Sequence, residues 1–425
     1  MKLYQHQIDG LKQTEGHPNC ALYWDMGLGK TFGGSEKMFQ YHNRINLVIC
    51  QKSKVNDWVN HFHEHYMWGA CDLTKKKNFE WFMDVYLPCE NIIPCVAVIN
   101  YELAWRRKDL LKLKDFTLML DESSLIQNKT AKQTKFILQL KPKNVILLSG
   151  TPTAGKYENL WTQAHLLGWN ISEQLYNSQY VNWKTIESDG FFHKIVDMDN
   201  PYKNVERLKQ KFRDYGAVFM KTEDVFSLPE QTFTFVNVPT TKEYRKFMKT
   251  GYVQLKDGTE LIGDQIFSKR LYARQLCGMY NQDKLDAFKE LIQSTNDRVI
   301  VFYNFTNELN KIVELISEMG RKISIINGQV KDLDAYNNDS NSITLIQHQA
   351  GVMGLNLQKA NKMVYFTLPE RSELFEQSKA RIHRIGQNRP CFYWILQCAD
   401  SVEERIYSTL QERKDFTDAL FVENC

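Results

Sequence analysis

The chain has 425 residues, 43% of them hydrophobic and 24% charged, which is the composition of an ordinary globular protein long enough for two or more domains. No apolar run could span a membrane, and the first ten residues lack the apolar stretch of a signal peptide, so we expect a cytoplasmic protein without a membrane partner. The formal net charge of +4 is too small to indicate nucleic-acid binding by itself, and nine cysteines without a C-x-x-C pair predict free thiols in a reducing compartment.

The first strong signal along the chain is the glycine-rich stretch "DMGLGKT". Gly27 and Gly29 let backbone amides face a phosphate, and the start of the following helix adds a favourable dipole. Lys30 can reach the β- and γ-phosphates of a nucleotide, and the hydroxyl of Thr31 can bind Mg²⁺. The alternative is a glycine turn without a nucleotide, since Trp24 stands where the usual pattern has its first glycine.

Short apolar runs rich in Val, Ile and Leu predict buried parallel strands. They fall into two sets, at residues 46–50, 95–100, 116–120 and 144–148, and at 298–303, 322–327, 343–347 and 362–366. Polar stretches with helical periodicity separate most of them, which predicts an α/β fold of doubly wound parallel sheets.

The region between the two sets has a different pattern, with helical segments and a predicted hairpin whose turn is Asp257-Gly258. We therefore expect three parts: a first lobe at 1–165, a helical insertion and connector with a hairpin at 166–280, and a second lobe at 281–425.

Polar residues follow several of the predicted strands, at the edge where open parallel sheets bind ligands. Asp121 and Glu122 end the run at 116–120; the first can hold a metal ion, and the second can polarise an attacking water. The alternative is a helix N-cap provided by the serines that follow. Ser149, Gly150 and Thr151 follow the run at 144–148 and can relay the nucleotide state, or form a plain turn.

The segment "ARIHRIGQ" near the end of the chain carries Arg381 and Arg384, which share one face of any helix on which they lie. A guanidinium can neutralise the charge that develops on a transferred phosphoryl group. Because Lys30 belongs to the other strand set, we expect a nucleotide between two lobes, with the arginines on the second. The alternative is a surface helix with exposed arginines.

Taken in order, these motifs resemble those of the Swi/Snf-type ATPases among the superfamily-two helicases. The resemblance rests on "LYQHQIDGL", "DMGLGKT", "LVICQKSKVNDW", "LSGTP", "FMKTEDVFSLP", "QAGVMGLNLQ" and above all "HRIGQ". It implies two RecA-like lobes, with ATP and Mg²⁺ as cofactors, Gln7 as the residue that reads adenine, and Gly354 near the nucleotide. One departure is "DESS" where the family more often has D-E-A-H or D-E-G-H.

The resemblance also implies a DNA-stimulated ATPase that moves along double-stranded DNA. Nothing in the sequence indicates a dimer, so we expect a monomer. Single-stranded and branched DNA are further candidate partners, and the compact chain resembles a bacterial or viral motor, the latter in the host cytoplasm. Candidate DNA-facing residues are Lys52, Ser53, Asn100, Tyr101, Arg106, Arg107, Asn327, Gly328 and Gln349, although a solvated basic helix face is the alternative for the two arginines. Two other functions stay open: a strand-separating DNA or RNA helicase, and a catalytically silent DNA-binding scaffold.

Overall fold

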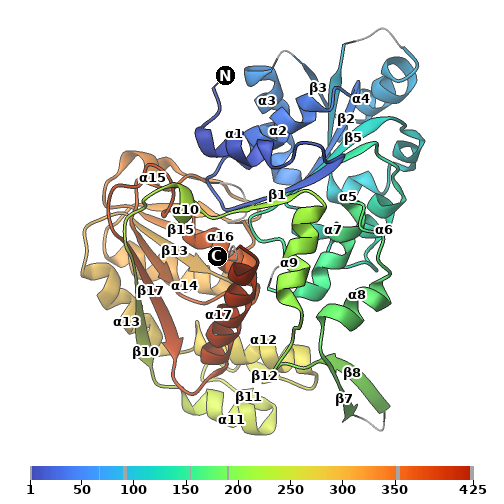
Figure 1. Ribbon diagram of the computed structural model, residues 1–425. Coiled ribbons are helices and arrows are strands. Elements are labelled where there is room, and N and C mark those ends of the chain that lie inside the picture. Colours follow the sequence, from blue (N-terminus) through green and yellow to red (C-terminus); the bar gives the residue numbers. More distant parts are fainter. Residues whose placement is uncertain are drawn as a thin grey trace. The chain divides into compact units, whose positions relative to one another are not determined.

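The computed structural model describes residues 2–66, 68–89, 93–153, 155–188, 191–350 and 355–421 (Figure 1). The chain divides into two compact units. Unit 1 is Met1–Val225 together with Asp415–Cys425, and unit 2 is Phe226–Lys414. Among the described residues, no helix combines the length and the apolar composition needed to cross a membrane.

Unit 1 is built on a seven-stranded sheet in the order β3-β4-β2-β5-β6-β1-β9, in which every pair is parallel. Its strands are β1 (Asn19–Trp24), β2 (Ile45–Cys50), β3 (Gly69–Asp72), β4 (Cys95–Asn100), β5 (Phe116–Asp121), β6 (Asn144–Leu148) and β9 (Ala217–Met220). The central strands β2 and β4 are buried at all six positions, because helices cover both faces of the sheet; this is why their sequences read as continuous apolar runs.

The helices of unit 1 connect these strands, and an antiparallel hairpin, β7 (Trp183–Ser188) with β8 (Phe191–Val196), lies outside the sheet. The helices are α1 (Gln5–Lys12), α2 (Lys30–Gln40), α3 (Val55–His65), α4 (Lys76–Trp81), α5 (Tyr101–Ala104), α6 (Lys132–Gln139), α7 (Trp161–Leu166), α8 (Glu173–Tyr180), α9 (Val205–Asp214) and α10 (Thr222–Val225).

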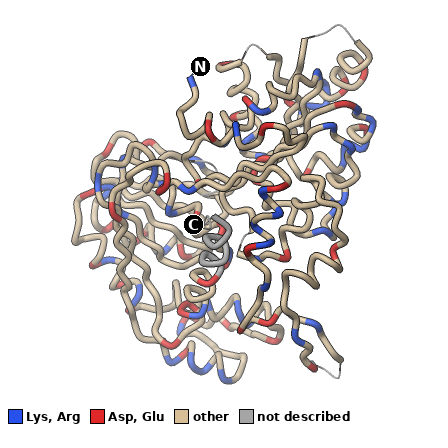
Figure 2. Tube along the Cα trace, viewed as in Figure 1, with Lys and Arg blue, Asp and Glu red and all other residues tan. Residues whose placement is uncertain are grey.

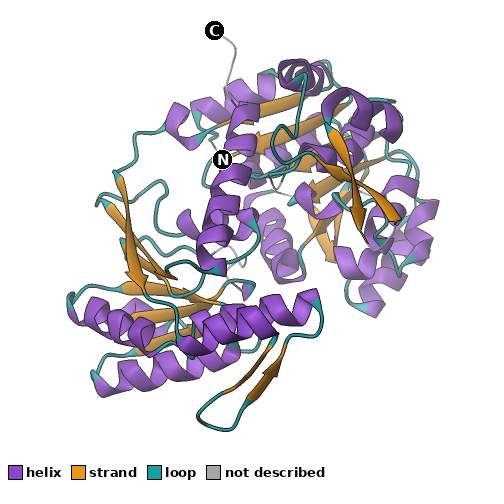
Figure 3. Cartoon of the chain, turned by 90° about the horizontal axis from the view of Figure 1, so that it is seen from below, coloured by secondary structure: helices purple, strands orange, loops and turns teal. Residues whose placement is uncertain are grey.

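Unit 2 is built on a six-stranded sheet in the order β10-β17-β16-β13-β15-β14, again parallel throughout. Its strands are β10 (Gln231–Val238), β13 (Val299–Tyr303), β14 (Ile323–Ile326), β15 (Ile343–Gln347), β16 (Lys362–Tyr365) and β17 (Cys391–Cys398). Figure 3 shows helices packed alongside the strands. They are α11 (Lys242–Thr250), α12 (Ile266–Cys277), α13 (Gln282–Gln293), α14 (Thr306–Glu318), α15 (Asp334–Asn338), α16 (Ser372–Lys379) and α17 (Val402–Phe421).

The predicted fold class is confirmed: the chain forms two doubly wound parallel α/β sheets, and all eight predicted strands are present. The sequence analysis missed five strands of the two sheets, which are β1, β3, β9, β10 and β17. The run "NCALYW" of β1 precedes the glycine-rich stretch and carries two aromatic residues in place of Val and Ile. The stretch 166–280 contributes β9 to the first sheet and β10 to the second. It also contains the hairpin of β11 (Tyr252–Gln254) and β12 (Glu260–Ile262), whose connection includes Asp257 and Gly258.

Candidate nucleotide site

The glycine-rich stretch forms the connection between β1 and α2, and two of its glycines have backbone conformations that other residues rarely adopt. Gly27 has φ 92° and Gly29 has φ 76°, both in the left-handed region. A Cβ atom on Gly29 would lie 2.1 Å from Nε2 of Gln7. Gly29 is also the N-cap of α2, so the loop ends directly at the start of an eleven-residue helix. Unsatisfied amides at such a helix start form an anion site.

Lys30 folds back over this loop. Its Nζ donates hydrogen bonds to the carbonyl oxygens of Trp24 (2.7 Å) and Asp25 (3.1 Å). The turn that follows β6 comes to the same place, because a Cβ on Gly150 would lie 3.3 Å from the lysine Nζ and 3.4 Å from the Trp24 carbonyl oxygen. We call Ser149, Gly150 and Thr151 the relay turn. The fold thus brings the lysine and the relay turn together, although 120 positions separate Lys30 from Gly150 in the sequence.

Gln7 is buried beside the same loop, with both ends of its amide bonded to backbone. Its Oε1 accepts from the Tyr4 amide (3.0 Å), and its Nε2 donates to the Leu28 carbonyl (3.2 Å) and, more weakly, to that of Gly29 (3.4 Å). These hydrogen bonds connect α1 to the glycine-rich stretch before α2, which we call the glycine loop. Reading adenine, the role implied by the resemblance, would require at least one of these bonds to be exchanged.

Asp121 is the last residue of β5, and two aromatic side chains fix it. The indole Nε1 of Trp58 donates to its Oδ2 (2.8 Å), and the Tyr101 hydroxyl donates to its backbone carbonyl (2.9 Å). Burial raises the pKa of the Asp121 carboxyl, while the Trp58 hydrogen bond and the charges of Lys30 and Lys54 act in the opposite direction.

Glu122 follows with φ 53°, a left-handed conformation that is uncommon outside glycine. It is the N-cap of the 3₁₀ turn Ser123–Ile126, so the chain turns sharply between the two acids. Strained backbone of this kind gathers at functional sites because the surrounding structure must impose it.

A residue that the sequence analysis missed, Gln163 on α7, joins the acidic segment to the relay turn. The side chain is fully buried; its Oε1 accepts from the hydroxyls of Ser123 (2.8 Å) and Tyr23 (3.0 Å), and its Nε2 donates to the Pro152 carbonyl (2.8 Å). Within that turn, Ser149 Oγ accepts from the Thr151 amide (3.1 Å). No local pattern marks Gln163, because its partners come from three separate strand ends.

The candidate DNA-facing residues of unit 1 follow two neighbouring strands. Lys52 and Ser53 are exposed after β2, and Asn100 ends β4, which pairs with β2 in the register Cys50 to Asn100. Asn100 and Tyr101 differ from the expectation, because both are buried. Asn100 Nδ2 donates a hydrogen bond to Glu102 Oε2 (2.6 Å), and the Tyr101 hydroxyl donates one to the Asp121 carbonyl (2.9 Å).

The two arginines after α5 also differ in exposure. Arg106 is exposed, with its guanidinium 5.2 Å from the ring centre of Trp105, whereas Arg107 is half-buried against the Phe79 ring at 4.4 Å. Of the pair, Arg106 is the better placed for a polyanion.

In unit 2, the predicted residues again follow strand ends. Asn327 Oδ1 accepts hydrogen bonds from the backbone amides of Gln329 (2.9 Å) and Val330 (2.8 Å) in a turn after β14, where Gly328 is exposed. Gln349 is exposed after β15. Gly354, expected near the nucleotide, lies outside the described residues.

The segment that carries the two arginines is not helical, contrary to the prediction. Helix α16 ends at Lys379, so Arg381 and Arg384 lie in the turns that follow and share no helix face. Arg381 is buried, with Nη1 3.5 Å from the Leu355 carbonyl oxygen, whereas Arg384 is half-buried and burial lowers its pKa.

The residues around Arg384 explain the sequence "HRIGQ". His383 Nε2 donates to the Pro229 carbonyl (2.8 Å). Gln387 is buried, and its Nε2 donates to the carbonyls of Ala360 (2.9 Å) and Ile382 (3.1 Å). Gly386 has φ 96°, which permits the tight turn. The histidine and the glutamine thus anchor the loop on both sides of Arg384.

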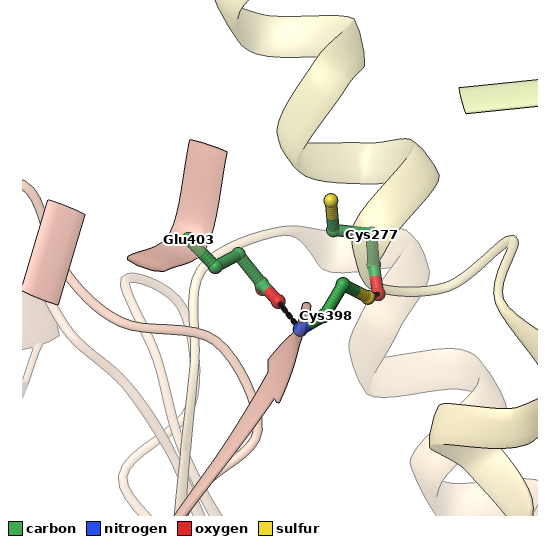
Figure 4. Close-up of side chains that lie close together, drawn as sticks. All are labelled: Cys277, Cys398 and Glu403. Atoms are coloured by element: carbon green, nitrogen blue, oxygen red, sulfur yellow. Dashed lines mark hydrogen bonds between the residues drawn. The ribbon is translucent and has the colours of Figure 1, made fainter. Parts of the chain in front are cut away.

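A second cluster of metal-type ligands lies in unit 2, where Cys277, Cys398 and Glu403 are buried side by side (Figure 4). Lys284 Nζ lies 2.6 Å from Glu403 Oε1, and the Cys398 amide donates to Oε2 (2.9 Å). Cys398 Sγ donates to the Cys277 carbonyl (3.3 Å). Both carboxylate oxygens are engaged and the charge is balanced, so this cluster needs no metal ion. The eight cysteines of the described part of the chain are free, and all but Cys89 are buried.

The donor set at the carboxyl edge of the first sheet does fit a magnesium nucleotide. Loop amides and the Lys30 ammonium suit phosphate oxygens, and an aspartate with a hydroxyl at Thr31 offers the oxygen ligands that Mg²⁺ prefers. Burial penalises the charge of the Asp121 carboxylate, and a cation bound there would relieve that penalty.

Two family models match the chain. The model described as "SNF2-related domain" matches residues 6–296, and "Helicase conserved C-terminal domain" matches residues 283–386.

Curated relatives are similar at low identity. The mouse SWI/SNF-related matrix-associated actin-dependent regulator of chromatin subfamily A member 1 is 25% identical over 95% of this chain and 42% of its own length. An uncharacterized ATP-dependent helicase of Mycoplasma pneumoniae is 21% identical over 99% of this chain and 42% of its own length. YqhH of Bacillus subtilis, also an uncharacterized ATP-dependent helicase, is 22% identical over 96% of this chain and 77% of its own length. The chain thus spans less than half of the first two of these proteins.

A solved structure, the Sulfolobus solfataricus SWI2/SNF2 ATPase core in complex with dsDNA, is 20% identical and matches 98% of this chain and 92% of its own. Its TM-score of 0.44 is too low to support a conclusion.

Proposed function

Because this chain belongs to the family of SNF2-related ATPase domains and also carries a helicase C-terminal domain, we propose that it hydrolyses ATP to move along double-stranded DNA. The observation that carries the proposal is a convergence on three neighbouring strands. The acids follow β5, the relay turn follows β6 and the glycine loop follows β1, and the sheet order is β5-β6-β1. Two inter-strand spacings of about 4.8 Å place all three motifs within roughly 10 Å along one edge.

In this proposal the amides of the glycine loop and Lys30 bind the β- and γ-phosphates of ATP. Asp121, held by Trp58, and Thr31 would hold Mg²⁺, which when bound supplies Lewis acidity to the phosphoryl oxygens. Glu122 orients the attacking water and accepts its proton on a carboxylate oxygen. Arg381 and Arg384 neutralise the charge of the transferred phosphoryl group, and the anchored loop of His383 and Gln387 would hold Arg384 ready for this role.

The choice of duplex DNA as the track is supported by the exposed Lys52 and Ser53 after β2 and by the exposed Arg106, which suit a phosphate backbone. The names of the bacterial relatives, ATP-dependent helicases, favour strand separation as the second candidate. A catalytically silent scaffold fits less well, because the sequence contains Lys30, Asp121 and Glu122, the residue types that hydrolysis would use.

The test is ATP turnover with no nucleic acid, and with duplex, single-stranded and branched DNA and RNA. We expect duplex DNA to give the strongest stimulation, and Lys30→Ala to reduce turnover by about 10²–10³-fold with folding unchanged. Lys77→Ala, on the exposed side of α4, is the matched control and should retain turnover. Absence of stimulation by any duplex would overturn the proposal, and displacement of a paired strand by the protein alone would favour the helicase alternative.

A further inference from the structure

Helix α11 of unit 2 carries a row of four cations that the proposed ATP chemistry does not use. Lys242, Arg245, Lys246 and Lys249 are spaced so that they share one face of the helix, and all four are exposed. Figure 2 shows Lys and Arg positions along this helix in blue, at the lower edge of the view. At about 1.5 Å per residue the row is roughly 10 Å long. We call these four residues the α11 cation row.

The α11 cation row lacks the carboxylate partners that usually neutralise surface lysines. Within the described residues, none of the four cations forms an ion pair. Glu243, the single acid on α11, stands three positions before Lys246 and forms no ion pair with it, and Glu260 of the adjoining hairpin accepts a hydrogen bond from the Tyr252 hydroxyl (3.0 Å). Lys246 lies 6.0 Å from the centre of that tyrosine ring. Helix α11 therefore presents a local excess of three positive charges.

The opposite face of α11 is buried in the core of unit 2. Tyr244 and Phe247 are buried, and they pack in a core with Val253, Leu261 and Leu276. An interfacial amphipathic helix binds a lipid surface by inserting its apolar face, and here that face is buried in the protein. The rigid row of cations suits an array of phosphates that stays outside the protein, as in the backbone of a nucleic acid.

The topology places the α11 cation row at the carboxyl edge of the second sheet, where candidate DNA-facing residues also lie. Helix α11 follows the carboxyl end of β10, and because the sheet is parallel throughout, this is the edge where Asn327 follows β14 and Gln349 follows β15. Strands β10 and β14 are the two outermost of the six, so five spacings of about 4.8 Å put them roughly 24 Å apart. A duplex crosses that width in about seven base pairs.

We propose that the α11 cation row is a contact site for the phosphate backbone of duplex DNA, additional to the residues at the ends of β14 and β15. This inference rests on the proposed function. The contact is electrostatic and carries no base specificity, and its role is to hold the duplex while the contacts nearer the nucleotide site release and re-form.

The test compares the full chain with the variant Lys242→Gln/Arg245→Gln/Lys246→Gln/Lys249→Gln in duplex binding at several salt concentrations, measured by fluorescence anisotropy. The matched control replaces Lys114, Lys135, Lys141 and Lys143 by Gln; these exposed lysines lie on α6 or just before β5 and β6, near the amino edge of the first sheet. Both variants change the net charge equally, and both should keep the wild-type melting temperature and the basal ATP turnover.

We expect the α11 variant to lower the salt slope of log Kobs by about two to four and to weaken binding by tenfold or more near 0.1 M salt. The control variant should lose much less, and replacing the three lysines by Arg should preserve binding. Equal slopes for the α11 and control variants, with the wild type still binding duplex, would overturn this inference and leave the proposed function intact. Failure of the wild type to bind any duplex would overturn the proposed function itself. Loss of binding to phosphatidylserine vesicles with duplex binding unchanged would assign the row to lipid and also overturn the inference.

Discussion

The indole Nε1 of Trp58 lies 2.8 Å from Oδ2 of Asp121 and donates a hydrogen bond to it. This contact joins α3 to the end of β5 and opposes the effect of burial, which raises the pKa of the carboxyl. An aspartate that is to hold a cation must be ionised, so the tryptophan helps to keep it in its working form.

We expect Trp58→Phe to move the acid limb of the pH–rate profile to higher pH. The ring is retained but the donor is lost, so the pKa of Asp121 rises further. A hydrogen bond to a charged group contributes about 1.5–3 kcal/mol, which corresponds to a displacement of the acid limb by about one to two pH units. The measurement is kcat/KM for ATP between about pH 5 and 9. Trp81→Phe, at an exposed position on α4, is the control, and coincident acid limbs for Trp58→Phe and wild type would contradict the assignment.

Asp121→Asn should abolish turnover and yet stabilise the nucleotide-free protein at neutral pH. Because the folded-state pKa of Asp121 is raised above its unfolded value, the ionised form destabilises the fold at pH values above the folded pKa, and the effect disappears below the unfolded pKa near 4. Asparagine cannot ionise and can still accept from Trp58. We therefore expect a higher free energy of unfolding than that of the wild type at neutral pH, with the difference shrinking as the pH falls, measured by calorimetry without nucleotide. A lower free energy of unfolding for Asp121→Asn than for the wild type at neutral pH would show that burial of the ionised Asp121 carboxylate does not destabilise the fold.

Gln163→Leu should remove the hydrogen bonds that connect the segment after β5, which begins with Glu122 and Ser123, to the turn after β6. The substitution leaves the buried hydroxyls of Ser123 and Tyr23 without their acceptor, at a cost of about 1–3 kcal/mol for each such group. We expect a lower melting temperature and a smaller ratio of DNA-stimulated to basal ATP turnover. Gln210→Leu, an exposed glutamine on α9, should change stability by less than about 0.5 kcal/mol. An unchanged stimulation ratio in Gln163→Leu would limit this residue to a packing role.

Arg384→Ala should lower kcat by about 10³–10⁵-fold while ATP binding is retained, because the guanidinium acts on charge that develops only during phosphoryl transfer. Arg389→Ala provides the control in the same segment: this arginine is exposed and donates to the Lys359 carbonyl (2.8 Å). Turnover and binding of a nucleotide analogue would be measured for both. Equal turnover of the two variants would remove Arg384 from the catalytic machinery.

The buried pair of Lys284 and Glu403 should matter for stability and not for metal binding. Removing one partner leaves an uncompensated buried charge, so Lys284→Met is expected to cost about 3–5 kcal/mol, and Lys284→Met with Glu403→Leu clearly less than the sum of the single substitutions. Chemical denaturation of the single and double variants checks this. A chelator should leave the melting temperature unchanged, and a drop on chelation would instead show that Cys277, Cys398 and Glu403 hold a metal ion.

The amino-acid sequence by itself determined the class of fold and the chemistry-bearing stretches. Apolar runs of five or six residues predict buried parallel strands because both faces of such strands are covered, and the eight predicted runs are strands in the structure. The glycines Gly27 and Gly29 and the acids Asp121 and Glu122 are equally local signals, because each is a residue type at the end of a strand or within five residues after it.

The tertiary structure alone decided which distant residues meet. Gln163 joins three strand ends, Trp58 on α3 is bonded to Asp121 at the end of β5, and Gln7 is bonded to the glycine loop. These hydrogen bonds join residues 11 to 140 positions apart. The spacing of Arg381 and Arg384 suggested a helix, but α16 ends before them, because His383 and Gln387 bind the backbone of other segments instead of continuing the helix. Local sequence fixes the propensity of a segment, whereas the partners of a buried polar group are set only when the sheets assemble and each donor must find an acceptor.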